Sequence, residues 1–388
     1  MTDVCTDVLT LTKQLIEIES HREAPGREGE IGRFLAEWFR DRGIDVDLQP
    51  VIDDRSNIIA RIRGGTGPSL MLCGHLDTVP AGEMRDAFAP RVEDGILWGR
   101  GACNMKGAVA AMACALAETK SELESGRLAL AGDLLFVGTA DEETGGLGVK
   151  AVVDHGLRTD YAIVGEPTGM RVTLAHKGAC FIRITLTGRG AHGSCPEAGV
   201  SAVSHAARVI RVLEEELRPR LAGRTHPLLG RSTLSVGRVC GGTQPNIVAE
   251  RCEVDVDRRT VPGDDDPLGE IGAIVSELCG TVDQLSADVV EMPMTSVVPH
   301  APLETSETSL IARAAMEAVS EIVGPDAAAP IGVTYWTDGG HLAANGMATV
   351  VLGPGDIAHA HGPLERVLIG ELERAVQVYR RIVDRGLG

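Results

Sequence analysis

A histidine and an aspartate, His75 and Asp77, follow an apolar run in the stretch LMLCGHLDTVP, which spans Leu70 to Pro80. The run predicts a buried strand, and open α/β sheets bind ligands at the carboxyl ends of such strands. Neutral imidazole is the commonest metal ligand, and a neighbouring carboxylate can fix which ring nitrogen carries the proton. His75 is therefore a candidate metal ligand, and the alternative is an ordinary buried histidine with a satisfied hydrogen bond.

Three further apolar segments lead into residues of the same types. The segment DLLFVGTA precedes the acidic residues Glu142 and Glu143, and YAIVG precedes Glu166. Near the C-terminus, ATVVLGPG leads into AHAHGP, which contains His359 and His361. If the strands are parallel, their carboxyl ends share one edge of the sheet, so we expect these side chains to meet there.

Convergence of His75, Glu143, Glu166 and His361 would suit a borderline divalent ion, zinc first and cobalt or manganese next. Calcium is disfavoured because it takes six or more oxygen ligands. Glu142 stands beside a ligand and would be placed to act as a general base. The chemistry expected from such a site is metal-assisted hydrolysis. The alternative for the adjacent glutamates is a solvated acidic loop.

The repeated order of strand, polar end and helix predicts an α/β fold with a mixed, mostly parallel sheet flanked by helices. At 388 residues the chain exceeds one usual core, so two domains are expected. From about residue 178 to residue 292 the order becomes β-α-β-β-α-β, which predicts an inserted two-layer α+β domain. We expect a catalytic, metal-binding domain made of 1–177 and 293–388, with the insertion at 178–292 between them. Within the first part, 86–100 is expected to be a loop.

The composition narrows the choice of partners and compartment. A formal net charge of −18 disfavours nucleic acid and anionic membranes as partners. No run of about eighteen apolar residues predicts a membrane span, and the N-terminus lacks the pattern of a signal peptide. The nine cysteines are scattered without a C-x-x-C pair, so we expect no disulfides and predict the reducing cytoplasm.

The stretches CGHLDTVP, WGRGACNMKG, TADEETGG, VGEPT and HAHGPLE resemble, in this order, the successive motifs of the M20 metallopeptidase family. This family includes acetylornithine deacetylase, succinyl-diaminopimelate desuccinylase and carboxypeptidase G. The resemblance covers nearly the whole chain and implies a zinc-exopeptidase-like fold whose insertion is a lid or dimerisation domain. It implies two metal ions, one held by His75 and Glu166 and the other by Glu143 and His361. His361 matches the family's H-x-x-x-E because Glu365 follows it by four residues.

The resemblance also implies roles for residues outside these two ligand pairs. Asp77 would orient the first histidine, and Glu142 would be the general base that then protonates the leaving amine. In the insertion, His192 would stabilise the oxyanion in a neighbouring protomer, which requires a homodimer. Asn246 and Arg259 match positions that grip the substrate carboxylate, for which a planar guanidinium is well suited. The alternative for His192 is an exposed loop histidine.

One residue departs from the family pattern. In WGRGACNMKG, Asn104 stands where the family has the aspartate that bridges the two metal ions. An amide oxygen can coordinate an ion but brings no negative charge, so we expect weaker metal occupancy and lower activity. An engineered inactivating change, a one-metal enzyme and a binder that does not cleave are the competing explanations. The resemblance also predicts a cis peptide bond after Asn104.

Two functions of different classes therefore stand side by side. The first is an amidohydrolase that removes an N-acyl group from an amino acid or cleaves a C-terminal residue. The second is a catalytically silent binder of acylated amino acids or peptides. An exopeptidase that needs a free substrate amine is a third possibility, for which we identify no acidic residue. Specificity is expected from the insertion and from 335–340 (YWTDGG).

Overall fold

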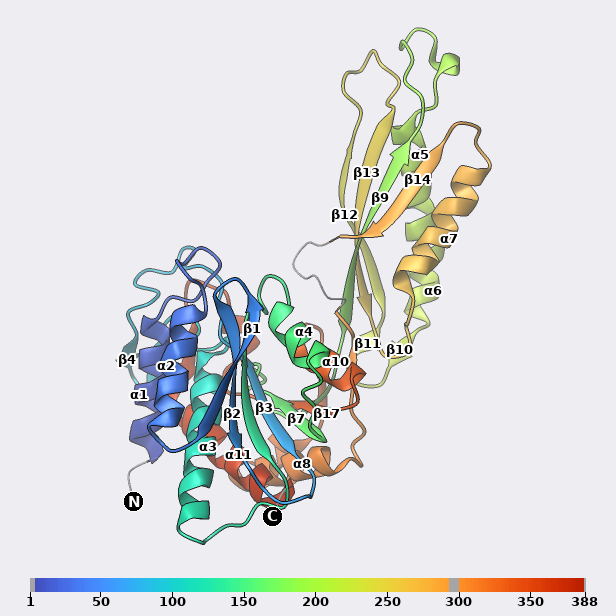
Figure 1. Ribbon diagram of the computed structural model, residues 1–388. Helices are drawn as coiled ribbons and strands as arrows, with labels where there is room; N and C mark the ends of the chain where they lie inside the picture. The colour runs from blue at the N-terminus through green and yellow to red at the C-terminus, as the bar shows by residue number, and fades with distance from the viewer. Residues whose placement is uncertain (1–3, 293–299, 387–388) are drawn as a thin grey trace.

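The computed structural model of the chain describes residues 4–292 and 300–386, apart from the side chains of 4–7 and 386. The chain forms a larger part, which carries both ends, and an elongated arm that projects from it (Figure 1). The predicted domain boundary between residues 292 and 293 adjoins 293–299, which lie outside the described residues.

A nine-stranded mixed sheet forms the centre of the larger part. The strands in spatial order are β1 (Asp45–Ile52), β2 (Arg55–Ile62), β6 (Leu134–Thr139), β3 (Leu70–His75), β7 (Tyr161–Val164), β17 (Ala348–Val351), β8 (Thr173–His176) and β15 (Leu303–Glu304), with β16 (Ile331–Val333) beside β8. The four central strands, β6, β3, β7 and β17, are parallel, while β1, β2 and β15 pair antiparallel with their neighbours. The carboxyl ends of the central strands therefore lie along one edge.

Helices cover both faces of this sheet. One face carries α1 (Val4–Glu17), α2 (Gly29–Arg40), α3 (Lys106–Glu124), α8 (Leu310–Ile322) and α11 (Ile369–Gly386), with the short α9 (Pro325–Ala328) against α8; the other carries α4 (Leu147–Asp154) and α10 (Asp338–Ala344). Strand β3 shows why both faces are covered: Leu70 and Leu72 enter one core, and Met71 and Cys73 enter the other. Among the described helices, none combines the length and the apolar character that a membrane crossing would need.

The expectation of a loop over 86–100 was wrong. This tract contains a hairpin of β4 (Arg91–Glu93) and β5 (Ile96–Trp98), and β5 also pairs with β18 (Arg366–Leu368). The turn is Asp94-Gly95, and both residues have positive φ, +50° and +76°. An Asp-Gly turn of this kind is a strong hairpin signal, which the sequence interpretation overlooked.

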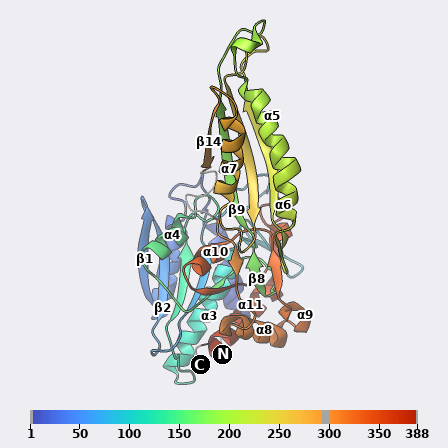
Figure 2. The same ribbon diagram turned by 90° about the vertical axis from the view of Figure 1, so that its right-hand side faces the viewer.

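The arm is a separate two-layer unit. Its antiparallel sheet has the strand order β12 (Thr233–Gly241), β13 (Arg251–Thr260), β9 (Gly178–Thr187) and β14 (Ser286–Glu291). Its helices are α5 (Ala202–Val212), α6 (Arg218–Ala222) and α7 (Pro267–Gly280). The short strands β10 (Thr225–His226) and β11 (Gly230–Arg231) form a small hairpin. A view at right angles shows the helices stacked on one face of the sheet (Figure 2). Leu186, Val209, Val254 and Val275 belong to a core of its own. The order of elements is the β-α-β-β-α-β that the sequence predicts.

Candidate active site

The ends of three parallel strands position most of the predicted ligands. His75 is the last residue of β3, Glu142 and Glu143 lie on the loop after β6, and Glu166 follows β7 by two residues. Strand β3 pairs in parallel with both β6 and β7, so these three ends are neighbours. His361 reaches the same place from the segment between η3 (Ile357–His359) and β18.

The predicted ligand side chains lie close together at this edge. His75 Nε2 is 3.4 Å from Glu166 Oε1 and 4.0 Å from Glu142 Oε2. His361 Nε2 is 2.7 Å from Glu143 Oε1. His75, Glu142 and Glu143 each offer a ligand atom within 4.8 Å of the others. The structure thus brings together residues from segments almost 300 positions apart in the chain.

Asn104 lies between the two ligand pairs. Its Nδ2 donates to Glu143 Oε1 at 3.0 Å and lies 3.0 Å from His361 Nε2, while its Oδ1 is 3.4 Å from His75 Nε2. The peptide bond between Asn104 and Met105 is cis, as the resemblance predicts. The side chain occupies the position expected of a bridging group, with an amide in place of a carboxylate.

Asp77 contacts the site differently from the prediction. His75 Nδ1 donates to the backbone carbonyl of Asp77 at 2.9 Å, whereas the Asp77 carboxylate is 3.5 Å away from that nitrogen. The carboxylate instead accepts hydrogen bonds from the backbone N–H groups of Glu142 and Glu143 at 3.1 and 2.9 Å. Asp77 therefore orients the histidine through its main chain and holds the glutamate loop through its side chain.

The electrostatics of the cluster favour a bound cation. Burial raises the pKa of Glu142, and nearby Glu166 and Glu143 raise it further. Burial likewise raises the pKa of Glu166 to about 7. Burial alone would lower the pKa of His75, but the surrounding carboxylates outweigh it and raise that pKa. Buried carboxylates this close together repel one another, and a divalent ion would remove that repulsion.

Glu365 has a structural role that the sequence interpretation missed. Its Oε1 accepts hydrogen bonds from the backbone N–H groups of Gly101, Cys103 and Asn104 at 3.0, 3.2 and 3.0 Å, and the buried Arg100 pairs with the same carboxylate. Glu365 is itself fully buried. The H-x-x-x-E spacing marked this residue but gave no hint that it fixes the backbone on which Asn104 stands.

A buried ion-pair network supports the glutamate loop from the other side. Arg55 Nε donates to Glu28 Oε2 at 2.6 Å, and Arg55 Nη2 donates to Asp141 Oδ1 at 2.5 Å. A Cβ atom on Gly145 would lie 1.9 Å from Asp141 Oδ2, so a larger residue there would push the Asp141 carboxylate out of its place beside Arg55. No spacing in the sequence connects Glu28, Arg55 and Asp141, which explains why this network was not predicted.

Asp338, at the start of α10, is a further buried acid near the site that the sequence interpretation did not single out. Its Oδ2 accepts a hydrogen bond from Thr139 Oγ1 at 2.8 Å, and its Oδ1 has no hydrogen-bond partner among the described residues. Burial raises the pKa of Asp338 to about 6. The sequence interpretation marked 335–340 only as a region that could set specificity.

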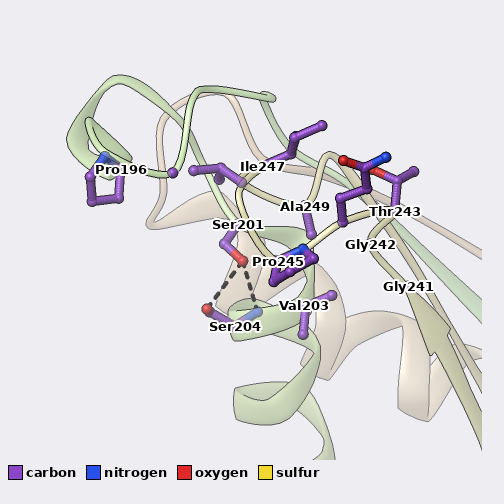
Figure 3. A pocket seen from close by; sticks show the side chains of 13 residues that line it. Pro196, Ser201, Val203, Ser204, Gly241, Gly242, Thr243, Pro245, Ile247 and Ala249 are labelled. Atoms are coloured by element: carbon purple, nitrogen blue, oxygen red, sulfur yellow. Dashed lines mark hydrogen bonds between the residues drawn. The ribbon is translucent and has the colours of Figure 1, made fainter.

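Two of the predicted residues of the arm, His192 and Asn246, are not brought to the predicted metal ligands of the same chain. Both lie in exposed loops at the far end of the arm, where His192 and Ile247 form a β-bridge and the N–H of Gly193 donates to the carbonyl of Asn246. That end points away from the larger part (Figure 1). A pocket of about 640 Å³ opens beside them, between the loop around Pro196, the start of α5 and the loop at 241–249 (Figure 3).

Arg259 lies at the opposite end of the arm, near the larger part. It is half-buried, and its guanidinium carbon is 5.4 Å from the ring centroid of Phe181. Its Nε donates to Asp257 Oδ1 at 2.9 Å. Arg259 is paired within the arm, and the structure does not place it in contact with the predicted metal ligands.

A sequence profile described as peptidase family M20/M25/M40 matches residues 71–385, most of the chain. The chain belongs to this family. It is therefore a hydrolase of the M20 type, which acts on C–N amide bonds.

Two curated proteins resemble this M20 protein over most of their length. An acetylornithine deacetylase of Proteus mirabilis (strain HI4320) is 31% identical over 365 residues, which cover 90% of this chain and 88% of that protein. An acetylornithine deacetylase of Myxococcus xanthus is 32% identical over 361 residues, or 89% of each chain.

Solved structures share the fold of this M20 protein. Aminopeptidase PepT from Bacillus cereus ATCC 10987 matches with a TM-score of 0.79 and 20% identity, covering 98% of both chains. The M20 metallo-carboxypeptidase Sso-CP2 from Sulfolobus solfataricus matches with a TM-score of 0.75 and 17% identity, covering 98% of this chain and 99% of its own. A protein from Bacillus subtilis described as a dinuclear metal-binding peptidase of the M20 family matches with a TM-score of 0.70 and 16% identity, over 98% and 97% of the two chains.

Proposed function

We propose that this M20 protein hydrolyses the amide bond of an N-acyl amino acid or a small peptide. The observation that supports this most strongly is the buried cluster in which Glu142 lies 4.0 Å from the Nε2 atom of the ligand His75. The name acetylornithine deacetylase, which both curated relatives carry, favours deacylation over peptide cleavage. Small molecules of this kind are the proposed substrates, and the cytoplasm is the proposed compartment.

The donor set fits divalent metal ions. Imidazole nitrogens and carboxylate oxygens together suit zinc, which we propose as the ion, with cobalt or manganese as alternatives. Of the two positions that the family arrangement implies, His75 and Glu166 would form one, and Glu143 and His361 the other. Ions held there would polarise the amide carbonyl and lower the pKa of a water molecule.

Glu142 is the proposed proton carrier. A buried carboxylate with a raised pKa can take the proton of the attacking water at neutral pH. The water oxygen then bonds to the carbonyl carbon, and the C–N bond breaks as Glu142 returns the proton to the leaving nitrogen. Asp77 would keep Glu142 in place through its hydrogen bond to the backbone of the glutamate loop.

The arm is proposed to act as a lid and dimerisation domain. Because the loop at 189–200, which contains His192, lies at the tip of the arm and points away from the larger part (Figure 1), the proposed oxyanion contact would be made with a second copy. The pocket beside His192 and Asn246 provides a surface for that contact. Arg259, at the base of the arm, is the proposed partner of the substrate carboxylate after lid closure.

The replacement of the bridging aspartate by Asn104 supports a second candidate function, binding without cleavage. A site without the bridging negative charge would hold metal more weakly and turn over more slowly, or bind an acylated amino acid without cleaving it. This binder is favoured by one observation, the hydrogen bond from Asn104 to the ligand Glu143.

A panel of N-acyl amino acids, with N-acetylornithine first, separates the two functions. Protein loaded with zinc or cobalt is expected to release free amine, and Glu142→Gln is expected to slow this release by roughly 10²–10⁴-fold while retaining the metal. Calorimetric binding of the same compounds by the wild type without any amine release would contradict hydrolysis and support the binder.

A further inference from the structure

The two predicted metal positions differ in the spacing of their ligand atoms. Two ligand atoms on one tetrahedral zinc ion, each at the usual bond length, lie roughly 3.3 Å apart. His75 Nε2 is 3.4 Å from Glu166 Oε1 and 3.4 Å from Asn104 Oδ1, which matches this spacing. His361 Nε2 and Glu143 Oε1 are only 2.7 Å apart, which is a direct hydrogen bond.

The lone pairs also differ between the two positions. The Nδ1 atom of His75 donates to the backbone carbonyl of Asp77, so in the neutral imidazole, the form that ligates a metal ion, the lone pair is on Nε2. That lone pair, Asn104 Oδ1 and the Glu166 carboxylate would then face one another as three acceptors, a set that a bound cation would satisfy.

At the other position, Asn104 presents a donor. Its Nδ2 donates to Glu143 Oε1 at 3.0 Å and lies 3.0 Å from His361 Nε2. An amide N–H group cannot ligate a metal ion, and a carboxamide has only one acceptor atom to offer, where an aspartate has two. Turning the amide round would move the N–H group to the position of His75 and Glu166, and it would set Oδ1 against the Glu143 carboxylate in place of the hydrogen bond from Nδ2.

We infer that Asn104 restricts tight metal binding to one ion per chain, at the position of His75, Glu166 and Asn104 Oδ1. The pair of Glu143 and His361 forms a hydrogen-bonded brace in this chain and binds a second ion at least 100-fold more weakly. A second dication would also lack the shared negative charge that screens its repulsion from the first. This inference rests on the proposed metal centre but not on turnover.

Zinc titration of the chelator-treated protein, followed by calorimetry and by elemental analysis after dialysis, tests the inference. We expect one tightly bound zinc in the wild type and two in Asn104→Asp. His361→Ala, a change at an exposed residue, is expected to keep the tight zinc, whereas Glu166→Gln is expected to lose it.

Two comparably tight ions in the wild type would overturn the inference, as would loss of the tight ion in His361→Ala. Glu143→Gln supplies a second test of the brace, since it too is expected to keep one zinc. If one zinc binds but no N-acyl amino acid is hydrolysed, the proposed function fails and this inference stands. If hydrolysis occurs with two tight ions, the reverse holds.

Discussion

The carboxylate of Asp77 accepts a hydrogen bond from the backbone N–H of Glu143 at 2.9 Å. This contact joins the loop after β3 to the loop after β6, and a second bond from the N–H of Glu142 to the same carboxylate reinforces it. The two glutamates are therefore positioned by a side chain from the loop after the neighbouring strand β3, as well as by their own strand β6.

Removing this anchor should weaken metal binding. In Asp77→Asn the amide group would turn an N–H toward at least one of the two backbone donors, so we expect zinc affinity to fall by roughly 10–100-fold. Calorimetric titration measures the change. Asp160→Asn is the matched control, because the Asp160 carboxylate accepts from the backbone N–H of Ser69 at an exposed site. Equal zinc affinity in Asp77→Asn and the wild type would contradict the anchoring role.

The network of Arg55 with Glu28 and Asp141 should contribute strongly to stability. All three side chains are less than 10% exposed, so Arg55→Leu would leave the buried Glu28 carboxylate without its cation and Asp141 with only the more exposed Arg27, at 3.6 Å. We expect a loss of about 3–5 kcal/mol in the free energy of unfolding. Urea denaturation measures it.

Arg61 provides the control for that experiment. It lies on the same strand, β2, and pairs with Asp133 at 3.4 Å, but both side chains are 29% exposed. Arg61→Leu is expected to change the free energy of unfolding by less than about 1 kcal/mol. If Arg55→Leu and Arg61→Leu lowered the free energy of unfolding by the same amount, the Arg55 network would stabilise the protein no more than an exposed ion pair does.

Three buried histidines at the junction of the arm and the larger part should make stability depend on pH. Burial lowers the pKa of His176 and His341 to about 4 and that of His300 to about 3. Each has a ring nitrogen without a hydrogen-bond partner among the described residues, and Arg259 lies near enough to His300 to disfavour its charge further. These histidines are neutral in the folded protein at pH 6.5. Above that pH they are neutral in the unfolded chain as well, so they no longer make the free energy of unfolding depend on pH.

As the pH falls below 6.5, the unfolded chain binds protons that the folded chain excludes, and stability is lost down to about pH 4. Each histidine should contribute about 1.4 kcal/mol per pH unit across this window. His341→Leu is expected to flatten the dependence of the unfolding free energy on pH by that amount. His155→Leu, at an exposed residue, should not. An unchanged slope in His341→Leu would refute the assignment.

Mixing two inactive variants tests whether His192 acts on a second copy. Glu142→Gln retains a working arm, and His192→Ala retains a working metal centre. If the contact is made between copies, exchange of subunits should restore roughly a quarter of wild-type amide hydrolysis, because half of the dimers are mixed and each holds one complete site. No recovery in a mixture that demonstrably exchanges subunits would place His192 outside the reaction.

The parallel sheet was predictable because its evidence is local. Each central strand is a short apolar run, and polar residues stand at its end or on the loop that follows it; His75, Glu142 and Glu166 were predicted from that pattern. The hairpin at 91–98 was equally local but was missed, because the Asp94-Gly95 turn was not weighed against the polar character of the tract. The supports of the site were not predictable in this way. Glu365 and Asn104 are 261 residues apart, and no periodicity connects them.

The sequence by itself determined which chemical groups lie at the strand ends. Both the formation of a strand and the residue type at its end depend on residues that are close together in the sequence. Only the tertiary structure decided which atoms of those groups meet. It set the Asp77 carboxylate against the glutamate backbone, left His192 at the far end of an arm, and turned the Asn104 amide toward Glu143 and His361. Such contacts depend on loops brought together from distant segments, where differences of less than an ångström separate a metal ligand from a hydrogen-bond partner.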